Sequence, residues 1–193
     1  MKKFLALVLS AALVLSFAGC GKKDEGDGAT EETGKAVQEE IVQLVNVDIP
    51  GLAEKRDSAV AIYNDYFKDS TSKDSETWRG KLENEALVTY DEYLESLNSL
   101  SYENAEVNNL RDLYIKSSEA QRDAIQYVVN AISEVDTENL DLASSSIKDS
   151  ETYMKMYQEE LKSLCEKYNI TMIGEFNTST ATDADAASAG DAE

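Results

Sequence analysis

The side chains that most often perform catalysis or bind transition metals are scarce in this sequence. Histidine is absent, so the commonest general base near neutral pH and the commonest transition-metal ligand are both missing. A di-iron site of the Glu-x-x-His type is excluded for the same reason. A serine or cysteine nucleophile would need Asp, Glu, Lys or Tyr as its activator, and neither a nucleophile elbow nor a glycine-rich phosphate loop occurs. We therefore expect no catalytic residue, no cofactor and no metal site, and a protein that is not an enzyme.

Acidic clusters are the first group that could bind an ion. Asp183 and Asp185 are spaced like the start of a calcium loop. The glycine expected at the sixth position of such a loop and the glutamate expected at the twelfth are both missing. Solvated charge is the better interpretation of these carboxylates.

The ten tyrosines are the second group. Eight of them fall on or beside apolar helical faces: Tyr63, Tyr66, Tyr90, Tyr93, Tyr114, Tyr127, Tyr157 and Tyr168. One interpretation is an aromatic-lined ligand cleft, in which Ser117 and Ser150 at core positions leave a small polar cavity. The interpretation that we favour is a core whose rings are buried while their hydroxyls reach the rim.

The beginning of the chain is typical of an export signal. Lys2 and Lys3 precede an uncharged run, residues 4–17, that is rich in Leu, Val and Ala. Fourteen residues are too few for a transmembrane helix, which needs about 20 apolar residues. We expect residues 1–19 to be removed as a signal peptide.

The run Phe17-Ala18-Gly19-Cys20-Gly21 resembles the lipobox of bacterial lipoprotein precursors, with Phe17 at the position where that family prefers Leu. The resemblance implies cleavage between Gly19 and Cys20 and a diacylglyceryl group on the Cys20 sulfur. Two acyl chains would hold the mature chain on the extracytoplasmic face of a cell membrane. The alternative is an ordinary secretory peptide cleaved nearby, but bulky Phe17 fits poorly three residues before such a cleavage site.

The charge of the mature chain limits its partners. Without residues 1–19, 16 basic residues face 38 acidic ones, which is a formal charge of −22. Nucleic acid is excluded because its binding depends on Lys and Arg displacing counterions. The same charge keeps the body away from anionic lipid.

Cys165 has no partner within the chain once Cys20 is acylated, so no disulfide is expected. We interpret Cys165 as a small buried hydrophobe, with intermolecular pairing as the alternative.

Composition divides the chain into segments. Residues 20–34 hold the lipidated Cys and a flexible linker rich in Gly and charge, and residues 173–193 form a disordered acidic tail. Residues 35–172 are the folded domain.

That domain is all-α, because aliphatic and Tyr residues recur at three- and four-residue steps. The clearest segment, 136–168, has two interleaved series of core positions seven residues apart: Leu140, Ile147, Met154, Leu161 and Tyr168, with Ala143, Ser150, Tyr157 and Leu164. Segment 102–135 places Leu110, Leu113, Tyr114, Ser117, Ala120, Ala124, Tyr127, Val128, Ala131 and Val135 on one face. Segment 75–100 does so with Trp78, Leu82, Ala86, Tyr90, Leu94 and Leu97, and the first helix with Leu52, Ala59, Tyr63, Tyr66 and Phe67.

The connections between these segments are short and contain helix-capping residues, namely 69–72, 99–101 and 136–137. Short connections favour antiparallel neighbours, so we predict an elongated up-and-down four-helix bundle. Pro50 predicts a break or kink in the first helix. Residues 36–47 then extend that helix, fold separately over the bundle end, or are disordered.

The leading hypothesis is a membrane-anchored, non-enzymatic lipoprotein, a structural or interaction module whose acidic surface meets a protein partner in the cell envelope. The alternative is a helical bundle that binds a small ligand or a cation.

Overall fold

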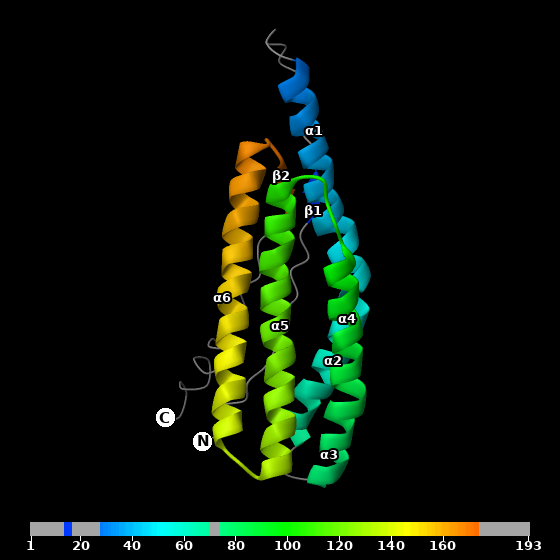
Figure 1. The fold of residues 1–193 in the computed structure, drawn as a ribbon, viewed down its shortest axis with the longest axis vertical. Helices are drawn as coiled ribbons and strands as arrows, with labels where there is room; N and C mark the ends of the chain where they lie inside the picture. The colour runs from blue at the N-terminus through cyan, green and yellow to red at the C-terminus, as the bar shows by residue number, and fades with distance from the viewer. Residues whose placement is uncertain (1–13, 17–27, 70–73, 174–193) are drawn as a thin grey trace, which may run out of the picture.

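The computed structural model describes residues 14–16, 28–69 and 74–173, and nearly all of them are helical (Figure 1). The elements are β1 (Val14–Ser16), α1 (Gly28–Gln43), the π-helix η1 (Leu44–Asp48), α2 (Ile49–Asp69), α3 (Ser75–Lys81), the π-helix η2 (Leu82–Ala86), α4 (Leu87–Ser99), α5 (Ala105–Glu134), α6 (Glu138–Lys167) and β2 (Thr171–Ile173). The two short strands pair antiparallel, with Leu15 opposite Met172. The prediction of an all-α chain is confirmed.

The helices join into four helical runs within the described residues: 28–69, 75–99, 105–134 and 138–167. The predicted segments match these runs to within a few residues at most ends. At 1.5 Å per residue, α5 and α6, with 30 residues each, are both about 45 Å long.

The helix is not broken at Pro50. Helical residues continue from α1 through η1 into α2, and the Ile49 N–H donates to the Leu44 carbonyl five residues back. This π-type turn directly precedes Pro50, which has no N–H to donate and would clash with a normal preceding turn. Residues 36–47 therefore extend the first helix, and Val37 and Ile41 are buried in the core.

The first helix also begins earlier than the sequence predicts. The linker is predicted over residues 20–34, whereas α1 begins at Gly28. The intervening segment holds Ala and Glu, which are good helix formers, and it leads directly into the amphipathic stretch around Val37. Of the predicted tail, 173–193, only residue 173 is described.

Helices α5 and α6 pack against each other, and most predicted core positions on α6 are buried. Figure 1 shows these two helices side by side, and Glu106 near the start of α5 bonds to Lys167 at the end of α6. The predicted positions Ile147, Met154, Leu161, Ala143, Ser150, Tyr157 and Leu164 are all buried. The core prediction is wrong at two positions. Val135, which is 91% exposed, directly follows α5, and Leu140, which is 36% exposed, lies in the first turn of α6, so both are at the end of the helix pair.

The remaining core positions are also largely as predicted. The buried ones are Leu110, Tyr114, Ser117, Ala124, Val128, Ala131, Trp78, Leu82, Ala86, Tyr90, Leu97, Ala59 and Tyr63. Leu113, Tyr127, Leu94, Leu52, Tyr66, Phe67 and Tyr168 are partly buried against this core. The predicted core residue Ala120 is half-buried. Helices α2 and α4 contact each other, and α4 contacts α5.

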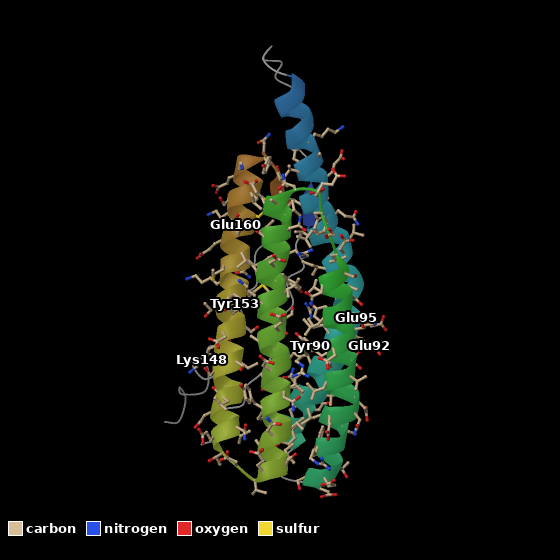
Figure 2. All side chains as sticks on the ribbon, in the orientation of Figure 1. Tyr90, Glu92, Glu95, Lys148, Tyr153 and Glu160 are labelled. Atoms are coloured by element: carbon tan, nitrogen blue, oxygen red, sulfur yellow. The ribbon has the colours of Figure 1, made fainter. Side chains whose placement is uncertain are left out.

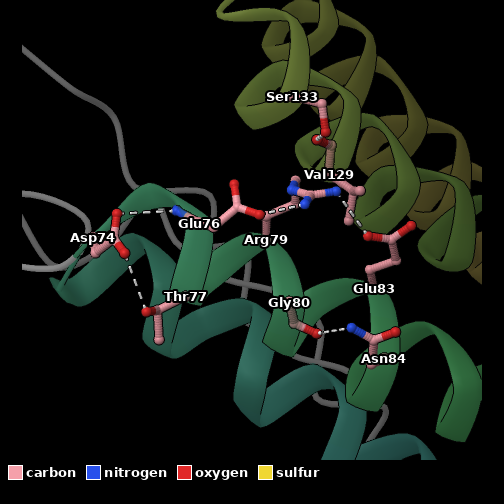
Figure 3. A network of polar contacts seen from close by, with 9 residues as sticks. All are labelled: Asp74, Glu76, Thr77, Arg79, Gly80, Glu83, Asn84, Val129 and Ser133. Carbon is pink, nitrogen blue, oxygen red and sulfur yellow. Dashed lines mark hydrogen bonds and ion pairs between the residues drawn. The ribbon is translucent and has the colours of Figure 1, made fainter.

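The capping residues differ from those predicted. Asp74 caps α3, where its carboxylate accepts the Glu76 N–H at 3.3 Å (Figure 3). Asn104 caps α5 rather than the predicted segment 99–101. The cap predicted at 136–137 holds, since Asp136 Oδ1 accepts the Glu138 N–H at 3.0 Å. Residues 70–72 of the predicted segment 69–72 lie outside the described residues. Each cap satisfies an N–H that the first turn of a helix leaves free.

Candidate functional site

The site residues predicted from the sequence lie outside the described part of the chain. Gly19 and Cys20 are these residues, and Asp183 and Asp185, interpreted above as solvated charge, lie outside the described residues as well. The described strand β1 belongs to the segment that the lipobox resemblance assigns to the signal peptide.

The tyrosines pack as core residues in pairs. Tyr90 and Tyr93 of α4 meet edge to face with ring centroids 5.3 Å apart, and Tyr114 of α5 meets Tyr157 of α6 at the same distance. All four rings are buried. Such pairs gain stability beyond the area that they bury.

Arg56 is a buried functional group that is not among the core or site residues predicted from the sequence. It is buried in α2, where its Nη1 donates to the Tyr114 hydroxyl at 2.8 Å. Its Nε and Nη2 both donate to Asp57 Oδ1, at 2.9 and 2.7 Å. Arg56 precedes Ala59 by three residues and Tyr63 by seven, so helical spacing already places it on the buried face.

The charge of Arg56 persists despite burial. Desolvation by itself would lower the pKa of the guanidinium, but Tyr114 and the hydrogen bond to Asp57 raise the pKa above its usual value. A buried guanidinium is costly unless it is paired and hydrogen-bonded. Arg56 is therefore a fixed positive charge beside the buried tyrosines. These are Tyr90, Tyr93, Tyr114 and Tyr157, here named the tyrosine cluster.

A chain of hydrogen bonds connects α4, α5 and α6 next to this cluster. The Tyr90 hydroxyl donates to Gln121 Oε1 at 2.7 Å, and Gln121 Nε2 donates to Ser150 Oγ at 3.1 Å. Ser117 Oγ donates to the Ser150 carbonyl at 2.9 Å, and the two serine Oγ atoms are 3.0 Å apart. Because each hydroxyl has one proton, Ser150 must donate to Ser117 in the last contact. Every member of the chain has a partner.

This arrangement changes the interpretation of Ser117 and Ser150, the two serines at core positions. The sequence allows Ser117 and Ser150 to leave a small polar cavity, whereas the structure brings their hydroxyls into direct contact across α5 and α6. A second contact of this kind joins α4 to α5, where the Tyr93 hydroxyl lies 3.2 Å from Ser118 Oγ. The polar groups hold helices together.

Burial suppresses acid–base chemistry in this core. It raises the pKa of the hydroxyls of Tyr63, Tyr90 and Tyr157 well above the usual value, so they stay neutral. It also raises the pKa of the Cys165 thiol to about 11. A thiol needs its thiolate form to act as a nucleophile, and burial disfavours that form.

The hydroxyl of Tyr63 is a buried polar group without a hydrogen-bond partner among the described residues. The Tyr63 hydroxyl makes no hydrogen bond within the described residues, although the side chain is fully buried. Its ring packs against Phe67, with centroids 5.0 Å apart. A buried hydroxyl without a partner costs free energy, and a bound water or ligand atom would relieve that cost.

The outer surface is mainly charged. In Figure 2, Tyr90 points from α4 toward α5, whereas Glu92 and Glu95 of the same helix point away from the bundle. Some surface carboxylates form local ion pairs, such as Glu83 with Arg79 at 3.2 Å (Figure 3). No group of three or more Asp, Glu or Cys side chains in the described ranges is arranged to hold a metal ion.

None of the described helices is both long enough and apolar enough to cross a membrane.

No protein-family model matches the chain, and neither the curated proteins nor the solved structures include a significant match.

Proposed function

We propose that the protein is a lipoprotein anchored by Cys20 to the extracytoplasmic face of a cell membrane, with a helical body that serves as an interaction or structural module. The observation that carries the proposal is the Phe17-Ala18-Gly19-Cys20-Gly21 run behind an uncharged export segment. The buried polar groups support the second half, because they bond to one another rather than converge on a reacting atom.

We further propose that the body is an up-and-down four-helix bundle, bent where η1 meets Pro50. Contacts at two levels support antiparallel packing of α5 and α6. Glu106 near the start of α5 bonds Lys167 near the end of α6, and Ser117 bonds Ser150 between them. The three-residue connection between α5 and α6 fits the same arrangement.

The anchor would place one end of the body near the membrane. Seven residues, 21–27, separate Cys20 from Gly28 at the start of α1. A chain spans at most about 3.5 Å per residue, so the start of α1 would lie within roughly 28 Å of the lipid surface. Cleavage after Gly19 would also remove β1 and leave β2 without its partner strand.

The formal charge of −22 in the mature chain favours a protein partner. Anionic lipid and nucleic acid are both repelled by a field of this sign.

The anchor is tested by expressing the full chain and its two cysteine variants in bacteria and fractionating the cells. We expect the wild-type chain in the membrane fraction, with a mature N-terminus at Cys20 that carries the mass of the acyl groups. Cys20→Ala should be neither acylated nor cleaved at Gly19. Cys165→Ala is the matched control and should behave as wild type. Recovery of an unacylated wild-type chain would refute the proposal.

A second candidate function, binding of a small ligand, is favoured by the Tyr63 hydroxyl. This hydroxyl is buried without a partner among the described residues, and a polar atom of a ligand would satisfy it. Native mass spectrometry on residues 21–193 separates the two functions. Excess mass in the native state that Tyr63→Phe abolishes would support the ligand, whereas an unmodified mass would support the interaction module.

A further inference from the structure

The ends of α5 and α6 have the same backbone geometry but different residues in the left-handed position. Val135 follows α5 and Asn169 follows α6, and each has a left-handed backbone with φ of 53°. After each, the next N–H donates to a carbonyl five residues back, from Asp136 to Ala131 at 3.2 Å and from Ile170 to Cys165 at 2.8 Å. This is the Schellman motif.

Asparagine tolerates the left-handed conformation, whereas a β-branched residue there is strained. At the end of α6 the motif also buries an apolar side chain, because Ile170 is only 6% exposed. At the end of α5 the strained residue is Val135, which is apolar and yet 91% exposed. Packing within the chain therefore does not explain valine at this position.

The surrounding segment, residues 134–142, is here named the α5–α6 tip. Six large hydrophobic residues are exposed in the described part of the chain, and Val135, Leu140 and Leu142 of the tip are three of them. The tip thus concentrates apolar side chains in solvent, as protein-binding surfaces do.

The charged residues within the tip itself are all acidic. It holds four acidic residues and no basic one, and the nearest basic residues in sequence are Arg122 and Lys148. Exposed apolar groups surrounded by negative charge complement an apolar pocket with a basic rim.

The tip also lies far from the start of α1. In Figure 1 the turn between α5 and α6 is at the opposite end of the bundle from the first turns of α1. If α1 is next to the lipid anchor, as proposed above, the tip faces away from the membrane.

We propose that the α5–α6 tip is the partner-binding end of this protein and that Val135 inserts into an apolar pocket, rimmed by Lys or Arg, on a protein partner. This inference rests on the proposed anchoring for its orientation, but not for the contact itself. The tip is small, so the complex belongs with weak, transient interfaces. Its charge makes association faster at low salt.

Strain is tested on the purified body, residues 21–193. Val135→Gly removes the steric penalty and should raise the Tm by about 2–4 °C. Asn169→Gly is the matched control and should change the Tm less, because asparagine already tolerates the conformation. A Tm that Val135→Gly leaves unchanged or lowers would overturn the claim that valine is retained against its strain.

Binding is tested in cells by photocrosslinking from position 137. Thr137 makes no capping hydrogen bond and is exposed, so a photoreactive residue there disturbs little. Met156, 45% exposed on α6, is the control position. We expect a specific protein adduct from 137, not from 156, and its loss when Val135→Asn is added.

The adduct is then identified, and the purified partner is titrated with the full set of variants. Burial of a valine predicts that Val135→Asn weakens binding by about 10- to 100-fold. Asp141→Lys should weaken it and reduce its salt dependence, whereas Asp149→Lys, farther along α6, should not. Equal adducts from both positions, or an adduct that survives Val135→Asn, would refute the proposal that the α5–α6 tip binds the partner.

These outcomes are distinct from those of the anchoring experiment. An acylated chain without a Val135-dependent adduct would support the lipoprotein proposal and refute partner binding by the α5–α6 tip. A chain that is never acylated but still gives the adduct would do the opposite.

Discussion

Replacing Tyr114 with phenylalanine should destabilise the protein more than the loss of one hydroxyl suggests. The variant keeps the ring contact with Tyr157 but removes the acceptor for Arg56 Nη1 at 2.8 Å. The side chain of Arg56 is only 9% exposed, so water reaches the abandoned donor poorly. A hydrogen bond to a charged group contributes about 1.5–3 kcal/mol, and we expect Tyr114→Phe to lower the free energy of unfolding by about 2 kcal/mol.

Arg56→Met should have a much smaller effect. It removes the charge together with its desolvation cost, and its ion-pair partner Asp57 is 64% exposed and returns to water. We expect a change within about 1 kcal/mol. In the Arg56→Met background, Tyr114→Phe should then cost less than about 1 kcal/mol, because no charged donor is left unpaired.

Urea denaturation of the four proteins measures this double-mutant cycle. With an m value of about 2 kcal/mol/M, Tyr114→Phe should lower the midpoint by about 1 M. The coupling free energy between Arg56 and Tyr114 should exceed about 1 kcal/mol. Equal costs of Tyr114→Phe in both backgrounds would refute the view that this hydroxyl stabilises the buried charge.

Three further predictions follow from the buried and bridging groups. Burial raises the pKa of Tyr90 in the folded state, so its stabilisation is complete below the unfolded pKa of about 10 and is lost as the pH rises further. The Tm should therefore fall above about pH 10, and tyrosinate absorbance that develops without unfolding in the wild type but not in Tyr90→Phe would contradict this. Ser150→Ala should lower the free energy of unfolding by about 1–3 kcal/mol, because Gln121 Nε2 loses its acceptor, whereas a change near zero in urea denaturation would show that the amide finds another partner. Hydrogen bonds from Lys167 and a tyrosine hydroxyl lower the pKa of Glu106. The stabilisation by Glu106 is therefore present above an unfolded pKa of about 4.3 and is lost as the pH falls through the folded value. The Tm values of wild type and Glu106→Gln should differ at neutral pH and converge in acid, and a constant difference across this range would be inconsistent with the assignment.

Local pattern carries much of the fold. Helical spacing identifies Ile147, Met154 and Leu161 as buried, because residues seven apart lie on the same face of a helix and that face is turned to the core. The same spacing includes Ser117 and Ser150, whose hydroxyls form the link between α5 and α6. Their polar nature alone does not tell a cavity from a hydrogen bond.

What the sequence by itself determines about this protein is its helical class, most of its core positions and the absence of histidine chemistry. These follow from residue types and from short-range periodicity. The hydrogen-bond partner of Arg56 and the exposure of Val135 and Leu140 are decided only by the tertiary structure. Arg56 stays buried because a tyrosine 58 residues away accepts its hydrogen bond, and the two apolar residues stay exposed because the helix pair ends at their turn. Which helix lies opposite a residue, and where that helix ends, is not encoded in its own neighbourhood.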